Sequence, residues 1–61
     1  MGTFVIYRDR AGEYRWRLLA HNNRIIADSG EGYRLQGDCE HGIALVKQLA
    51  PYANVKMEAL R

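Results

Sequence analysis

The stretch EYRWRLLA, residues 13–20, decides the fold. Tyr14, Trp16, Leu18 and Ala20 occupy its even-numbered positions, and two arginines stand between them. Successive side chains of a β-strand point to opposite faces of a sheet, so this alternation predicts a half-buried strand whose even-numbered residues face the core. Such a strand needs neighbouring strands and a cover for its apolar face, and the flanking sequence predicts both.

A strand is predicted on each side of this stretch. Residues 3–8 are rich in β-branched and aromatic side chains, and Gly12 can take the left-handed conformation that closes a hairpin loop. After the central strand, residues 22–23 are both asparagine and predict a two-residue turn. A short third strand over 24–28 completes a meander of three antiparallel strands.

A helix is predicted over residues 36–50. Apolar residues recur there at the helical spacing, on a stripe that begins at Cys39 and continues with Ile43. Pro51 is expected to end the helix, because the residue before a proline is driven towards extended backbone. Gly42 costs about 1 kcal/mol relative to alanine inside a helix, so we expect it to mark a close approach of the helix to the sheet.

Residues 55–59 alternate again and predict a fourth strand, with Val55, Met57 and Ala59 on one face. The fold class is therefore α+β, a βββαβ unit in which one helix covers an antiparallel sheet. A short terminal strand with an exposed edge is suited to pairing with another chain, so we expect a homodimer in which this strand crosses over. The predicted core comprises Phe4, Ile6, Trp16, Leu18, Ile25, Ile43, Val46 and Leu49.

The short length of the chain favours assembly with a second copy. The chain has 61 residues and 7.0 kDa, which predicts a single domain over 1–61. Domains below about 70–80 residues usually add disulfides, a metal or a partner chain. Cys39 is the only cysteine, which excludes an intramolecular disulfide. The sequence has no signal-peptide pattern and no apolar run of about 18 residues, so we expect a cytoplasmic protein that spans no membrane.

Two short motifs contain residues that could carry chemistry. The segment DCEH, residues 38–41, has four residues able to bind a metal, but consecutive helical residues point about 100° apart and cannot converge on one ion. Gly30, Gly32 and Gly37 precede the helix, yet no Gly-Lys-Ser/Thr follows, so a bend is favoured over a phosphate loop. We therefore expect no metal, no cofactor and no catalytic site.

The YRWRL strand at residues 14–18, together with the GEGY loop at 30–33, resembles the YegP-like family. The similarity runs from about residue 3 to Pro51. This family consists of small bacterial and archaeal proteins, present in one copy or as a tandem repeat. The resemblance implies a βββαβ unit paired with a second copy into one sheet, with the C-terminal strands exchanged, and it implies no known activity. Arg34 and Leu35 stand where the family often has serines, so we expect a different entry into the helix.

The remaining candidate surface is basic. Five residues are predicted to form it: Arg8, Arg10, Arg15, Arg17 and His21. Arginines and tyrosines on an exposed sheet are typical of surfaces that hold single-stranded nucleic acid, but they are equally typical of a solvated face neutralised by nearby acids. The net charge of only +2 favours the second reading. The sequence thus predicts a non-catalytic binding or scaffolding module, with nucleic-acid binding as the alternative.

Overall fold

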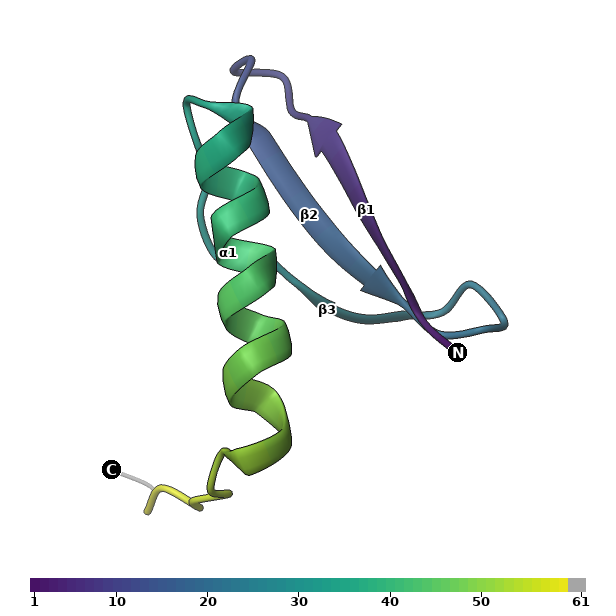
Figure 1. Cartoon of the computed structure of the whole chain (residues 1–61), viewed down its shortest axis with the longest axis vertical. Helices are drawn as coiled ribbons and strands as arrows, with labels where there is room; N and C mark the ends of the chain where they lie inside the picture. The colour runs from purple at the N-terminus through teal and green to yellow at the C-terminus, as the bar shows by residue number, and fades with distance from the viewer. Residues whose placement is uncertain (60–61) are drawn as a thin grey trace.

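The computed structural model describes residues 1–59 and has the α+β architecture expected from the sequence, a three-stranded antiparallel sheet covered on one face by one helix (Figure 1). The strands lie in the order β1-β2-β3. The elements are β1 (Thr3–Arg8), β2 (Tyr14–Leu19), β3 (Ile25–Asp28), α1 (Gln36–Leu49) and a 3₁₀ turn, η1 (Ala50–Tyr52).

The β1–β2 hairpin is regular and is closed by a side chain. Its register runs from Thr3 opposite Leu19 to Arg8 opposite Tyr14. In the loop, the Asp9 carboxylate accepts hydrogen bonds from two backbone N–H groups, those of residues 11 and 13, at 2.9 and 3.0 Å. Gly12 has a φ of 82°, the left-handed conformation that the sequence predicted for it.

The β2–β3 pairing contains a bulge that the sequence analysis did not anticipate. Leu18 pairs with Ala27, but Leu19 pairs with Ile25, so Ile26 is an additional residue in β3. Because Leu19 lies on the face of the sheet away from the helix, Ile25 pairs on that face too and is 58% exposed. The prediction that Ile25 belongs to the core is therefore wrong.

The core centres on Trp16, which is 7% exposed, and Cys39, which is fully buried. The ring of Phe4 meets Trp16 edge-on, with centroids 5.4 Å apart. Gly42 provides the close approach that the sequence predicted: a Cβ added there would lie 2.7 Å from Tyr33 Oη and 3.7 Å from Trp16 Nε1. A single large side chain from β2 thus fills the space between sheet and helix.

The other predicted core residues are less buried than expected. Five of them are half-buried: Phe4, Ile6, Leu18, Ile43 and Val46. Leu49 is 59% exposed, so its assignment to the core is wrong. The reason is geometric, because the last part of α1 extends beyond the sheet and has no strand beneath it (Figure 1).

The two ends of α1 differ from a standard capped helix. Leu35 occupies the N-cap position without a side-chain hydrogen bond, which agrees with the loss of the family's serines there. At the other end, α1 stops at Leu49, and Pro51 lies in the η1 turn, closed by a hydrogen bond from Ala53 N to Ala50 O. At 14 residues, α1 is too short to span a bilayer, and none of the helices in the described part of the chain has the required length and apolarity.

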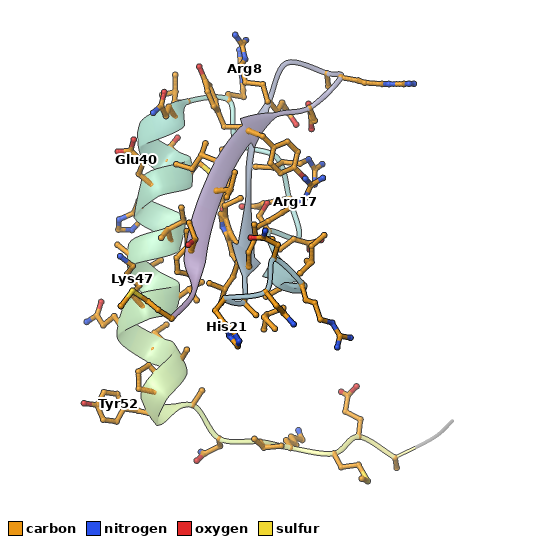
Figure 2. All side chains as sticks on the ribbon, turned by 90° about the vertical axis from the view of Figure 1, so that its right-hand side faces the viewer. Arg8, Arg17, His21, Glu40, Lys47 and Tyr52 are labelled. Atoms are coloured by element: carbon orange, nitrogen blue, oxygen red, sulfur yellow. The ribbon has the colours of Figure 1, made fainter. Side chains whose placement is uncertain are left out.

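Residues 53–59 adopt no secondary structure in the single chain, so the predicted fourth strand over 55–59 is not formed there. They leave the end of α1 as an extended segment that touches neither sheet nor helix (Figure 2). Val55 and Met57 are 101% and 93% exposed. A strand requires a neighbour for its backbone N–H and C=O groups, and this chain does not bring one to the segment.

Candidate binding surface of the sheet

The face of the sheet opposite α1 is the outer face, and it carries part of the predicted basic surface. Val5 pairs with Arg17 and Tyr7 with Arg15, so these four side chains share the outer face of β1 and β2. The opposite face carries Trp16 and is covered by α1. The alternation in the central strand therefore predicted both faces of β2 correctly.

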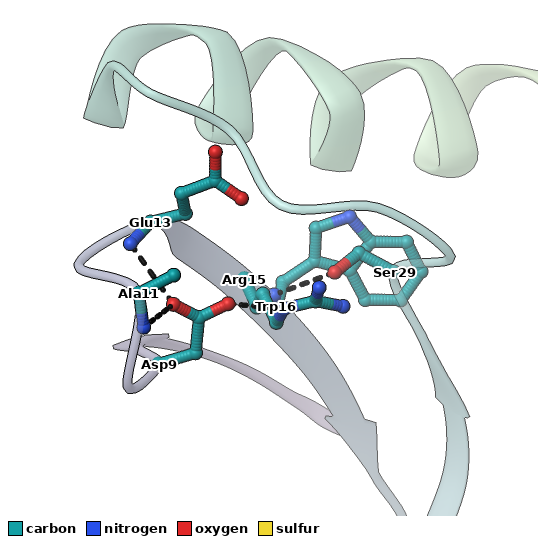
Figure 3. A network of polar contacts seen from close by, with 6 residues as sticks. All are labelled: Asp9, Ala11, Glu13, Arg15, Trp16 and Ser29. Atoms are coloured by element: carbon teal, nitrogen blue, oxygen red, sulfur yellow. Dashed lines mark hydrogen bonds and ion pairs between the residues drawn. The ribbon is translucent and has the colours of Figure 1, made fainter.

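Arg15 is held by an ion pair rather than left free. Its Nε donates a hydrogen bond to Asp9 Oδ2 at 2.6 Å (Figure 3). This hydrogen bond, together with that from the backbone N–H of Glu13, lowers the pKa of Asp9, and in return it raises the pKa of Arg15. One of the basic side chains of the outer face is therefore neutralised by the loop that closes the hairpin.

Arg17 stacks on an aromatic ring. Its guanidinium carbon lies 4.2 Å from the centroid of the Tyr7 ring, within the range of a cation–π contact. Arg17 also pairs across the sheet with Asp28 of β3, an exposed acid on the same face. The positive charge at the centre of the outer face thus has an acid on the neighbouring strand.

The other three predicted residues lie elsewhere. Arg8 pairs with Tyr14, on the helix side of the sheet, and its guanidinium lies 5.2 Å from the centroid of that ring. Arg10 belongs to the loop between β1 and β2, and His21 to the turn between β2 and β3. Figure 2 shows Arg8 and His21 at opposite ends of the sheet, with Arg17 between them. Of the five, only Arg15 and Arg17 share the outer face, at alternate positions of β2. Ligand binding by these residues stays a prediction.

Ser29, which directly follows β3, has a structural role that the sequence did not predict. Ser29 is 6% exposed, and its Oγ accepts a hydrogen bond from the backbone N–H of Trp16 at 3.2 Å (Figure 3). Its own N–H donates to the carbonyl of Trp16 at 2.9 Å. The side chain of Ser29 thus continues the β2–β3 ladder past Asp28 and fixes the strand position of Trp16.

The DCEH segment, residues 38–41, does not converge on one point. Cys39 faces the sheet as a free buried thiol, and desolvation raises its pKa, which keeps it protonated and unreactive. Glu40 instead accepts a hydrogen bond from the Gln36 side chain at 3.0 Å. Within residues 1–59, no three His, Cys, Asp or Glu side chains lie close enough to hold a metal ion.

An open depression lies at the start of α1, lined by Arg34, Leu35 and Asp38. The helix start beside it has backbone N–H groups without a side-chain cap. The only sequence signal for this feature is the absence of a capping side chain at Leu35. Asp38 within the first helical turn already places a negative charge near these N–H groups.

Comparisons with known proteins agree with this geometry. A model of a domain of unknown function (DUF1508) matches residues 9–56. A UPF0339 protein of Neisseria meningitidis serogroup B is 49% identical over 53 residues, which are 87% of this chain and 93% of the relative. The solution NMR structure of a protein from Haloferax volcanii superposes with a TM-score of 0.89 at 44% identity, covering 93% of this chain and 95% of the other.

A further relative is longer. The UPF0339 protein encoded in the ptx operon 5' region of Stutzerimonas stutzeri is 50% identical over 50 residues, which are 82% of this chain but only 44% of that protein. More than half of that relative therefore lies outside the match. The shared fold, the family match and the identity to these relatives lead to one conclusion: the chain belongs to the DUF1508 family of UPF0339, YegP-like proteins, whose function is unknown.

Proposed function

We propose that this protein is a non-catalytic binding or scaffolding module that acts as a homodimer, with its C-terminal segments exchanged between the two copies. The observation that carries the proposal is the surface area of the single chain. It exposes 5544 Å², whereas a folded monomer of this mass exposes about 4,000 Å². The excess is about 1,500 Å² per chain, so a dimer that covered it would bury about 3,000 Å², a typical value for obligate homodimers.

The C-terminal segment has the chemistry of a strand that awaits a partner. Val55, Met57 and Ala59 alternate with Lys56 and Glu58, which gives the segment one apolar and one charged side. All five residues are exposed. An alternating strand gains stability only when its apolar side is buried and its backbone is paired, and a second copy of the chain can supply both.

The longer relative from Stutzerimonas stutzeri supports the same assembly. The part of it outside the match is large enough to hold a second unit of this size, since the match covers only 44% of its length. Two units in one chain and two identical chains meet the same physical need, because each unit buries too little surface on its own. The proposal includes a cytoplasmic location, which the free thiol of Cys39 supports because reducing compartments keep cysteines unpaired.

Light scattering coupled to size-exclusion chromatography tests the assembly. We expect a mass of twice the 7.0 kDa of one chain at micromolar concentration. Buried apolar surface is insensitive to salt, so the mass should stay the same between low and high ionic strength. A mass near that of one chain would overturn the proposed function.

Nucleic-acid binding is the alternative, and the contact of Arg17 with Tyr7 is the observation in its favour. Its weakness is that Arg15 already pairs with Asp9 and Arg8 lies on the other face. Titration of a labelled single-stranded oligonucleotide at low and high salt separates the two candidates. We expect no binding at low salt; binding that weakens steeply with salt and is lost in Arg17→Gln would establish the alternative.

A further inference from the structure

The outer face of the sheet carries a group of apolar side chains next to Arg17. Val5 pairs with Arg17 across β1 and β2. Leu19 lies two residues further along β2 and pairs with Ile25, so both lie on the same face as Arg17. Val5 is 38% exposed and Ile25 58% exposed. Single exposed apolar residues are ordinary, but a group of neighbours on one face is typical of an interaction site.

The bulge in β3 places Ile25 in this group. In a regular ladder continued from the pair of Leu18 with Ala27, Ile26 would stand opposite Leu19, and Ile25 would face the helix side of the sheet. Because Ile26 is the additional residue, Ile25 is turned to the outer face instead. Bulges often serve to re-aim a side chain at a functional surface, and here the sheet gives up a core residue to do so.

The guanidinium of Arg17 is positioned but has no acidic partner. It lies over the ring of Tyr7 in β1, whereas Asp28, the residue opposite Arg17 in the register, belongs to β3. Within residues 1–59 the ion pair of Arg15 with Asp9 is the only one, so Arg17 and Asp28 form none. Stacking uses the flat side of a guanidinium and leaves its N–H edges free to bind a carboxylate.

We propose that the outer face is the docking site for an extended segment of a partner protein in which one Asp or Glu alternates with aliphatic residues. The carboxylate pairs with Arg17, and an aliphatic residue two positions away packs against Leu19 and Ile25. The spacing matches, because residues two apart in an extended chain lie about 7 Å apart on one face, as Arg17 and Leu19 do on β2. The inference rests on the proposed binding function and names its partner, and it does not require the dimer.

The chemistry of this face favours a protein segment over nucleic acid. Sheets that hold single-stranded nucleic acid offer free aromatic rings to the bases. In the sheet of this chain, Tyr7 is the only aromatic residue of the outer face, and Arg17 already covers one side of its ring. Asp28 next to Arg17 would repel a row of phosphates, but it leaves room for a single carboxylate directed at Arg17.

A short peptide tests the docking site. The capped peptide Thr-Ile-Thr-Glu-Thr-Ile-Thr has the same order of side chains in both directions, so it suits either orientation along β2. In a titration of protein labelled with nitrogen-15, we expect the amides of Val5, Leu19 and Ile25 to shift, with a dissociation constant below about 1 mM. The amides of His41 and Lys47 on α1 should not move.

Two control peptides separate charge from spacing. Glutamine in place of glutamate removes the carboxylate and should weaken binding at least about fivefold, because hydrogen bonds between two charged groups are the strong ones. The peptide Thr-Thr-Ile-Glu-Ile-Thr-Thr has the same composition, but its isoleucines point away from the side of the glutamate. It should bind at least about fivefold more weakly as well.

Variants of the protein test the same contacts. Arg17→Gln and Ile25→Ser should each weaken binding of the first peptide at least about fivefold. Both residues are exposed, so the amide spectrum of α1 should stay unchanged and show that the fold is kept. Gln48→Ser, at an exposed position of α1, is the control and should leave the affinity as it is.

The outcomes separate this inference from the proposed homodimer. A dimeric protein whose outer-face amides do not shift, or that binds the two isomeric peptides equally well, would overturn the inference while the dimer stands. A monomeric protein that binds the first peptide as described would support the inference while the dimer fails. A single-stranded oligonucleotide that shifts the same amides and displaces the peptide would overturn it in favour of nucleic-acid binding.

Discussion

Removal of residues 52–61 is expected to give a chain that neither dimerises nor unfolds cooperatively at 25 °C. The truncated chain keeps α1 and all three strands, but it loses the segment with which it would cover a second copy. The core that remains is small, because only Trp16 and Cys39 are buried apolar residues in the described part of the chain. A single core in a domain of this size rarely supplies more than about 3–5 kcal/mol of stability. The proposed interface of about 3,000 Å² would bury enough apolar surface that its loss removes more free energy than this core supplies.

Two full-length variants separate the loss of contacts from the loss of chain. Val55→Ser combined with Met57→Ser keeps the length of the segment and removes its apolar side, so it should behave like the truncation. Lys56→Gln, between them, should keep the dimer. Circular dichroism follows the cooperativity of unfolding, and light scattering follows the mass of the assembly. A truncated chain that is monomeric and melts at the temperature of the full-length protein would rule out strand exchange.

The strands could be predicted because their signals are local. The alternation of residues 13–20 fixed the two faces of β2, and Gly12 fixed the hairpin loop. The bulge in β3 could not be predicted, because Ile25 and Ile26 are identical residues and only the pairing with β2 decides which of them is extra. The exposure of Ile25 follows from that pairing and was mispredicted for the same reason.

For the candidate binding surface too, local signals could be predicted and contacts between separate segments could not. Arg15 and Arg17 were placed correctly on the outer face by the alternation of β2. The position of Arg8 also had a signal, since it lies two residues after Ile6 and so shares the face of the core residues of β1. The ion pair of Arg15 with Asp9 had none, because a loop side chain that reaches back to a strand depends on the loop conformation.

The predicted fourth strand has a local sequence signal but is not formed in the single chain. Residues 55–59 have the alternation of a strand, but an alternating pattern describes which side would be buried and not what buries it. In the single chain, no neighbour reaches the segment, and it stays extended and exposed. The pattern therefore shows which side of the segment would be buried if the proposed second copy paired with it, and it does not describe the fold of one copy.

Substitution of Trp16 by alanine is expected to abolish the folded state. Trp16 is 7% exposed, contacts Phe4 edge-on and lies against Gly42 of α1, so it links β1, β2 and α1. Replacing a buried tryptophan by alanine costs about 3–5 kcal/mol, which equals the whole stability that such a core supplies. The far-UV circular dichroism of Trp16→Ala should therefore show no cooperative melting transition.

Trp16→Phe is the matched control, and it separates packing from hydrogen bonding. The indole Nε1 of Trp16 is buried and has no hydrogen-bond partner among residues 1–59. A buried donor without a partner costs about 1–3 kcal/mol, and phenylalanine removes that donor while it keeps an aromatic ring against Phe4 and Gly42. The gain offsets part of the packing lost with the smaller ring, so Trp16→Phe should remain folded, with a loss of less than about 2 kcal/mol in the free energy of unfolding. If Trp16→Ala melted within a few degrees of the unmodified protein, the sheet and helix would be held together by other contacts, and the core described around Trp16 would be wrong.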